Sequence, residues 1–272
     1  MNKTILITGA SRGFGKIWTE AFLKQGYKVA ATARNVDSLN YLVEEYGESV
    51  LPLQLDVTNR DQCFEVVSKT QQRFGKIDVL INNAGYGLFG TIEEASEKEA
   101  RDQFETNVFG TLWMTQAAIP VMRNQGGGHI IQLSSVLGVA TVPLMGLYNA
   151  TKFAIEGLTE TMATEVQAFG IKTTLVEPIA YTTDFSTASG VISSNPIAVY
   201  EEFKKAVFEQ FRTMPNGDPS ATADVILKVV EAENPPTRIF FGKTALPWVK
   251  QVYQGRLNEW ESVNDLSEAA HE

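Results

Sequence analysis

The feature that most constrains the fold is an unbroken alternation of short apolar runs and helical patterns along the first 177 residues. Short apolar runs bounded by turn residues are typical of strands buried on both faces. They stand at 4–7, 27–34, 50–55, 78–81, 129–133 and 172–177, and a seventh follows at 238–241. Strands that alternate with helices predict a doubly wound α/β fold with right-handed crossovers. We therefore expect a seven-stranded parallel sheet covered by helices.

A glycine-rich turn follows the first apolar run and predicts an anion site. Residues Thr8 to Gly15 read Thr-Gly-Ala-Ser-Arg-Gly-Phe-Gly, and a helical pattern begins there. Backbone N–H groups and the helix dipole point at a phosphate in such a turn, and glycines permit its close approach. The spacing is G-x-x-x-G-x-G rather than the G-x-G-x-x-G dinucleotide fingerprint. A tight connection without a ligand therefore stays open as the alternative.

Two arginines favour NADP(H) over NAD as the cofactor. The second predicted strand ends in Ala33-Arg34, with no acidic residue until Asp37. In a dinucleotide fold an acidic residue at this point binds the ribose of NAD, whereas an arginine accommodates the 2′-phosphate of NADP. Arg12 in the glycine turn could reach the same phosphate, and arginine–phosphate contacts are charge-assisted and often bidentate. The alternative is that both arginines are solvated surface residues.

Tyr148 and Lys152 could carry acid–base chemistry. They lie four apart in a predicted helix that continues to about residue 168, so they share one face of it. An ammonium one turn away favours the phenolate and lowers the pKa of the phenol. Such a pair could exchange a proton with an alcohol or ketone oxygen. Alone the pair is common, but it follows the fifth strand, and ligands of such sheets bind beyond the carboxyl ends of the strands.

We expect one domain over residues 1–272, with a substrate lid at 179–219 and a C-terminal extension at 244–272. The strand–helix alternation breaks after Pro178, and a long insertion at the ligand edge indicates a lid. We expect one helix within it over 197–211 and, earlier in the chain, another over 97–123. The apolar lid residues would line a pocket or pack the insertion's own core; they are Ile179, Tyr181, Phe185, Val191, Ile192, Tyr200 and Phe203.

The composition narrows the classes of partner and setting. A formal net charge of −9 disfavours nucleic-acid and membrane surfaces as partners. One cysteine and two histidines leave too few soft ligands for a typical zinc site, so no metal is expected. Neither a secretory signal nor an apolar run of membrane-spanning length is visible, so we expect a cytoplasmic protein. The amphipathic tail at 246–261 could cover the sheet edge, close the pocket or contact a partner.

With these features placed, residues 3–242 resemble the classical short-chain dehydrogenase/reductase family, which has a Rossmann-type fold. The segment from Thr8 to Gly15 looks like the family's cofactor turn, Asp56-Val57 resembles the pair beside the adenine, and residues 82–85 resemble its Asn-Asn-Ala-Gly motif. The resemblance implies that NADP(H) is held by Gly9, Ser11, Arg12, Gly13, Phe14, Gly15, Arg34, Asp56, Val57, Asn83, Ala84, Gly85, Tyr148, Lys152, Pro178, Ile179 and Thr183.

The resemblance also implies a catalytic tetrad of Asn107, Ser135, Tyr148 and Lys152. Ser135 is chosen over Ser134 because the family's serine commonly lies thirteen residues before the tyrosine. Tyr148 would donate the proton and Ser135 would bind the same oxygen. Lys152 would lower the pKa of Tyr148 and hold the ribose hydroxyls, while Asn107 would support a water chain leading to Lys152.

One position departs from the family pattern. The family usually reads Pro-Gly after the sixth strand, whereas this chain reads Pro178-Ile179. A β-branched residue does not easily take positive φ. We therefore expect the turn beside the nicotinamide to differ, which also affects the placement of Thr183.

The lid and the tail segment 255–260 resemble the hydroxysteroid- or retinol-dehydrogenase-like branch, many of whose bacterial members are ketone reductases. The implied activity is reversible, NADPH-dependent reduction of a hydrophobic ketone to a secondary alcohol. Two alternatives stay open: a 3-oxoacyl carrier-protein reductase, and a non-catalytic NADP(H)-binding redox sensor. Family members usually assemble through the helices that bear Asn107 and Tyr148, so we expect a homodimer or homotetramer.

Overall fold

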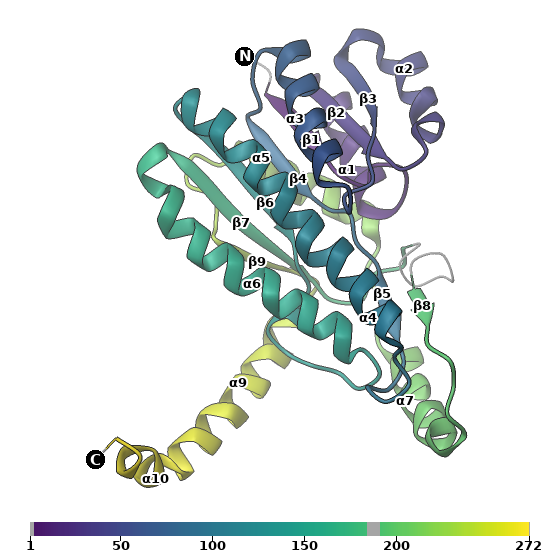
Figure 1. Cartoon of the computed structure of the whole chain (residues 1–272), viewed down its shortest axis with the longest axis vertical. Helices are drawn as coiled ribbons and strands as arrows, with labels where there is room; N and C mark the ends of the chain where they lie inside the picture. Colours follow the sequence, from purple (N-terminus) through teal and green to yellow (C-terminus); the bar gives the residue numbers. More distant parts are fainter. Residues whose placement is uncertain (1–2, 184–190, 272) are drawn as a thin grey trace.

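A seven-stranded parallel sheet forms the centre of the protein (Figure 1). The structure, a computed structural model, describes residues 3–183 and 191–271. The strand order is β3-β2-β1-β4-β6-β7-β9, so the order reverses between β1 and β4. This confirms the expected α/β fold class. The strands are β1 (Thr4–Ile7), β2 (Lys28–Ala33), β3 (Val50–Gln54), β4 (Val79–Asn82), β6 (Gly128–Leu133), β7 (Ile171–Pro178) and β9 (Arg238–Phe241).

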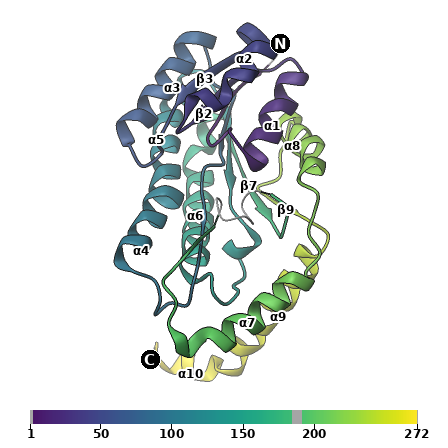
Figure 2. The same cartoon turned by 90° about the vertical axis from the view of Figure 1, so that its right-hand side faces the viewer.

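Helices connect these strands and cover both faces of the sheet (Figure 2). They are α1 (Gly13–Lys24), α2 (Asn40–Tyr46), α3 (Arg60–Phe74), α4 (Glu97–Phe104), α5 (Gly110–Asn124), α6 (Gly146–Val166), α7 (Glu201–Thr213), α8 (Thr222–Glu231), α9 (Ala245–Ser262) and α10 (Asn264–Ala269). The helix expected over 97–123 is interrupted: a π-helical turn, η3 (Glu105–Phe109), joins α4 to α5.

The alternation of side chains along each strand divides the core into two layers. Ile5 and Ile7 point to one face of β1, where they pack with residues of α1, α2 and α8. Leu6 points to the other face and packs with residues of α3, α5 and α6. Because both faces are covered, the strands are largely apolar, as is typical of parallel sheets. The polar side chains buried within them are paired, as His129 of β6 is with Thr174 of β7 (2.8 Å).

The segment expected to form the lid is fastened to the body by a short second sheet and a buried carboxylate. Strand β8 (Val191–Ser193) pairs with β5 (Gly87–Phe89), a strand that the sequence did not predict. Glu94, with a fully buried side chain, accepts hydrogen bonds from the backbone N–H groups of Ile197 and Thr91, both at 2.8 Å, and pairs with Lys204 of α7. Phe185 of the expected lid lies outside the described residues.

The C-terminal helices begin against the body and then leave it. Ala245 and Val249 of α9 pack against Val136 and Val139, which follow β6. Beyond them α9 and α10 extend away from the sheet (Figure 1). None of the helices in the described residues combines the length and the apolar character that crossing a membrane takes.

We predict that Glu94→Gln loosens the lid. The hydrogen bonds to Lys204, Ile197 and Thr91 lower the pKa of Glu94 to about 2, so these partners stabilise the charged carboxylate. An uncharged amide leaves the half-buried Lys204 ammonium without its counter-ion. Hydrogen exchange should therefore accelerate over residues 194–213 in this variant.

The control is Glu202→Gln, which removes an exposed carboxylate paired with the neighbouring Lys205. Exposed pairs of this kind contribute little to stability. Equal exchange rates in the two variants would contradict an anchoring role for Glu94.

Candidate active site

One cleft of about 1530 Å³ runs along the carboxyl edge of the sheet. The sequence-predicted cofactor and catalytic residues line it, with the exception of Gly15 and Asn107. These residues come from strand ends and helix starts that are up to 174 residues apart, between Gly9 and Thr183. Parallel strands bring their carboxyl ends to the same edge, which explains why distant motifs converge.

The glycine turn after β1 is built for close packing. Gly9 has φ +69° and Gly13 has φ +54°, values that favour glycine. A Cβ on Gly15 would lie 2.1 Å from the carbonyl oxygen of Gly9, so Gly15 permits the turn without lining the cleft. Asn83 completes the turn from β4, since its Nδ2 donates to the carbonyl oxygens of Thr8 (2.8 Å) and Gly9 (3.1 Å). The turn therefore presents the start of α1 to the cleft, as a phosphate site requires.

The residues expected around the adenosine half of NADP(H) also face this cleft. Arg12 caps the start of α1 and Arg34 follows β2, and both line the cleft. Asp56 is fixed by Thr58, whose N–H and hydroxyl donate to its Oδ1 at 3.0 and 2.8 Å. Two cationic side chains beside a helix N-terminus fit a ligand that has one phosphate group at the helix N-terminus and another at the arginines.

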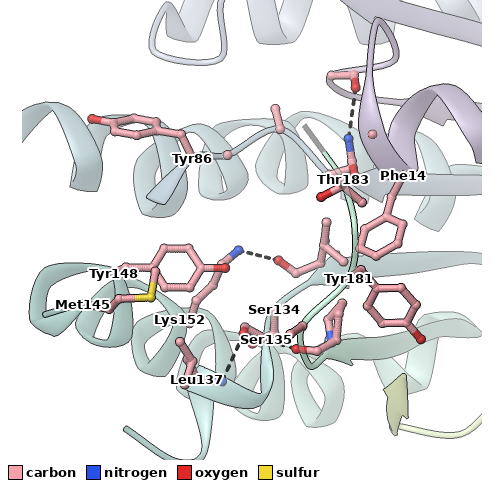
Figure 3. A pocket seen from close by; sticks show the side chains of 18 of the residues that line it. Phe14, Tyr86, Ser134, Ser135, Leu137, Met145, Tyr148, Lys152, Tyr181 and Thr183 are labelled. Carbon is pink, nitrogen blue, oxygen red and sulfur yellow. Dashed lines mark hydrogen bonds between the residues drawn. The ribbon is translucent and has the colours of Figure 1, made fainter. Parts of the chain in front are cut away.

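Tyr148, Lys152 and Ser135 come together at the centre of the cleft (Figure 3). Tyr148 and Lys152 lie one turn apart near the start of α6, and the side chain of Ser135 lies beside that of Tyr148. The Lys152 ammonium donates to the carbonyl oxygen of Leu133 (2.7 Å) and lies 5.5 Å from the centroid of the Tyr148 ring. A phenol, a hydroxyl and an ammonium thus share one space.

Burial sets the ionisation of this pair. Tyr148 is 7% exposed, and burial raises its pKa above the usual value while the nearby Ser135 side chain opposes the rise. Burial also lowers the pKa of Lys152 to about 8, and Glu156 opposes that shift. The net direction for Tyr148 is therefore upward, because the charged phenolate loses hydration when it is buried. A lowering effect of Lys152 on this pKa stays a prediction.

Asn107 supports the site from behind the cleft wall. It lies in the π-helical turn η3, and such turns frequently occur at functional sites. Its Oδ1 accepts from the N–H of Tyr86 (3.1 Å), and its Nδ2 donates to the carbonyl oxygen of Tyr86 (2.9 Å) and to Thr151 Oγ1 (3.2 Å). The side chain therefore fixes the segment after β4 against α6. A role in a water chain stays a prediction.

The Pro178-Ile179 turn keeps an ordinary backbone at Ile179. Among the described residues, Leu144 is the non-glycine residue with positive φ, at 63°. Ile179 donates its N–H to the carbonyl oxygen of Phe241 (3.0 Å), and its side chain faces Gly242. A Cβ on Gly242 would lie 2.4 Å from Ile179 Cγ2. The space for the isoleucine is thus provided by a glycine 63 residues later, and Thr183 still reaches the cleft.

The apolar wall of the cleft differs from the one predicted. Ile179 and Tyr181 line it, but Tyr200 and Phe203 do not, and Phe203 is exposed. The wall instead contains an aromatic cluster of Phe89, Phe208 and Phe211, with ring centroids 5.7 to 6.5 Å apart. The C-terminal half of α7 faces the cleft. This orientation depends on how the lid packs against the body of the protein. Thr244 and Trp248 at the start of α9 also line the cleft.

Comparison with known proteins agrees with these motifs. Residues 3–190 match the sequence model for short chain dehydrogenases. The oxidoreductase BOA17 of Botryotinia fuckeliana is 36% identical, over 97% of this chain and 96% of its own. A 3-ketodihydrosphingosine reductase of Bacteroides thetaiotaomicron is 37% identical, over 88% of this chain and 87% of its own.

Solved structures of the same kind superpose along most of the chain. A short-chain dehydrogenase from Streptomyces avermitilis has a TM-score of 0.91 at 33% identity and covers 99% of both chains. ElxO with NADP bound has a TM-score of 0.77 at 28% identity, covering 91% of this chain and all of its own. A Burkholderia phymatum enzyme in complex with NAD has a TM-score of 0.83 at 25% identity, covering 95% of each chain.

We predict that Gly242→Ala destabilises the protein through Ile179. The new methyl group would meet Ile179 Cγ2 at a position where φ is +111°. Clash and strain together should lower the free energy of unfolding by roughly 2–4 kcal/mol, measured by urea denaturation. Adding Ile179→Ala should recover the part due to the clash.

Gly47→Ala serves as the matched control, because Gly47 also has positive φ but a Cβ there meets nothing within 4 Å. It should show strain alone. A Gly242→Ala cost no larger than that of Gly47→Ala, or no recovery on truncating Ile179, would contradict the proposed packing.

Proposed function

Because the chain belongs to the short-chain dehydrogenase family, we propose that it reduces a hydrophobic ketone to a secondary alcohol with NADPH, reversibly. The observation that carries the proposal is the meeting of Ser135, Tyr148 and Lys152 at the centre of a cleft whose other end has a phosphate-binding turn. An intact acid–base set argues against a redox sensor, which would have no need of it.

The geometry suits proton transfer to a carbonyl oxygen during reduction. Bound NADPH supplies the hydride. A phenol whose pKa is raised by burial holds its proton at neutral pH, so Tyr148 is ready to act as the general acid. Ser135, which lies beside Tyr148, would orient the substrate oxygen and stabilise negative charge on it. Lys152 would bind the ribose hydroxyls and offset that charge, since a pKa of about 8 leaves it mainly protonated at pH 7.

We propose NADP(H) rather than NAD as the cofactor on the strength of Arg12 and Arg34. Both side chains line the end of the cleft that contains the glycine turn, and Arg34 occupies the position where an NAD-preferring site has an acid. Structural neighbours include proteins bound to NADP and to NAD, so the family alone leaves the choice open.

The cleft wall supports an apolar substrate. Aromatic and aliphatic side chains surround the space beyond Tyr148, contributed by Phe89, Met145, Phe208, Phe211, Met214 and Trp248. A relative named 3-ketodihydrosphingosine reductase would act on a ketone attached to a long alkyl chain. The carrier-protein alternative is less favoured, because two basic side chains at the lid, Lys205 and Arg212, are already paired with Glu202 and Glu209.

We also propose assembly through α5 and α6, as in other family members. Phe109 before α5 and Phe153 and Leu158 on α6 are exposed apolar side chains. Burial of these residues against a second copy would remove them from water. A homodimer or homotetramer would account for them.

Tyr148→Phe should reduce ketone turnover by at least about 10²-fold, because it removes the general acid and leaves the ring in place. The measurement is NADPH consumption with aryl ketones, steroid-like ketones and a 3-oxoacyl thioester. NADPH binding, followed by its fluorescence, should persist. Retained turnover would refute the assignment of Tyr148, and a wild-type protein that binds NADPH but reduces none of the panel would favour the sensor.

Arg34→Ser should discriminate between the two cofactors. Loss of a charge-assisted contact to the 2′-phosphate should raise the Kd for NADPH about tenfold to a hundredfold and leave that for NADH nearly unchanged. Arg123→Ser is the control, since Arg123 lies at the end of α5, on the opposite edge of the sheet. Equal weakening of both cofactors by Arg34→Ser would contradict a 2′-phosphate contact.

A further inference from the structure

Helix α6 presents four polar side chains in one stripe, of which two belong to the site described above. Tyr148, Lys152, Glu156 and Glu160 are spaced by four residues and therefore lie on one face of the helix. The first three face consecutive residues at the end of β6. Tyr148 lies beside Ser135, Lys152 donates to the carbonyl oxygen of Leu133, and Glu156 accepts from the hydroxyl of Ser134.

Arg238 pairs with the two residues at the C-terminal end of the same stripe, Glu156 and Glu160. Its Nη1 pairs with Glu156 and lies 2.8 Å from Glu177 Oε1, and its Nη2 lies 2.7 Å from Glu160 Oε1. Glu177 is fully buried at the end of β7, directly before Pro178, whose carbonyl oxygen lies 3.3 Å from Ser135 Oγ. Burial and the nearby Glu156 raise the pKa of Glu177 to about 7, and Arg238 opposes the rise.

The packing around Glu156 leaves little freedom for its carboxylate. Its side chain is 7% exposed. A Cβ on Gly138, in the turn after Ser135, would lie 2.8 Å from Glu156 Oε1 and 2.6 Å from Ser134 Oγ. The Ser134 hydroxyl and the Arg238 guanidinium both donate to it. The Glu156 carboxylate is therefore held in place one helical turn from Lys152.

Several charged or titratable groups lie on the elements around Lys152. Glu177 and Arg238 come from β7 and β9, Asp102 and Glu105 from α4 and η3, and Tyr148 and Glu156 from α6 itself. Among the described residues, Glu156 is the charged group that counters the effect of burial on Lys152. Glu160, one turn further along, shares Arg238 but is mostly exposed.

We propose that Glu156, held by Arg238 and Ser134, is a positioning residue that keeps Lys152 protonated at neutral pH and docked on the end of β6. The network thereby extends the Ser135–Tyr148–Lys152 set by one helical turn. The inference rests on the proposed function in one respect, since it takes Lys152 as the residue that binds the cofactor ribose.

The test is the pH dependence of NADPH binding to the full-length protein, which needs no ketone. In the wild type, affinity should fall about tenfold as Lys152 loses its proton, between pH 7 and 10. Glu156→Gln keeps the shape and the acceptor for Ser134 but removes the charge. A negative charge raises the pKa of a nearby ammonium, so its removal should move the midpoint to lower pH by about half to one unit.

Two further variants separate charge from packing. Glu156→Asp keeps the charge and should hold the midpoint near that of the wild type. Glu160→Gln removes a carboxylate from the same Arg238 and should leave the midpoint unchanged, since this side chain is mostly exposed. If Glu156→Gln does not fold, Ser134→Ala removes one of the two contacts that hold the Glu156 carboxylate and leaves every charge in place, and it should still move the midpoint to lower pH.

An unshifted midpoint in Glu156→Gln, even with a lowered Tm, would overturn the proposal, because a purely structural role has that outcome. An equal shift in Glu160→Gln would overturn it as well. If the midpoints shift as expected but the wild type reduces no ketone, the proposed function fails while the role of Glu156 stands.

Discussion

In a parallel sheet that is buried on both faces, polar side chains concentrate at the ends of the strands. The rest of this structure depends on that constraint. Side chains within the strands alternate between two apolar layers, as Ile5 and Leu6 do in β1. A polar residue in the middle of a strand would be desolvated without partners. Motifs of polar residues therefore stand where strands end, and the parallel arrangement collects these ends at a single edge.

The edge is held together by hydrogen bonds that cross from one strand end to the next. Asn83 at the end of β4 donates to the turn after β1, and Asn82 joins Thr115 of α5 to Gln132 of β6. The polar stripe on α6 likewise holds the end of β6, through the contacts of Lys152 with Leu133 and of Glu156 with Ser134. These contacts fix backbone rather than substrate, which explains why a cleft of this size keeps a defined shape at its centre.

Most of the residues that line this edge of the sheet were predicted from the sequence, whereas few of those that the lid contributes were predicted. Local signals sufficed where a motif is continuous, as in the glycine turn, or is repeated at helical spacing, as in Tyr148 and Lys152. They failed where two distant segments decide the outcome. The space for Ile179 comes from Gly242, and the inward face of α7 follows from the anchoring of Lys204 by Glu94. Spacing also does not give the net direction of the Tyr148 pKa shift, because it reports the distance to a cation but not the loss of water around the phenol.

Burial acts on the two central groups in opposite directions, and this decides how the site is poised. It raises the pKa of a phenol and lowers that of an ammonium, since both charged forms lose hydration. A neutral phenol suits the proposed reduction, in which Tyr148 would give up a proton, but the same burial weakens the cation that would offset charge on the substrate oxygen. The Glu156 carboxylate, one turn further along α6, opposes the effect of burial on Lys152. In the proposed mechanism, the Glu156–Arg238 pair would thus help one cleft to hold a protonated acid and a charged lysine at the same pH.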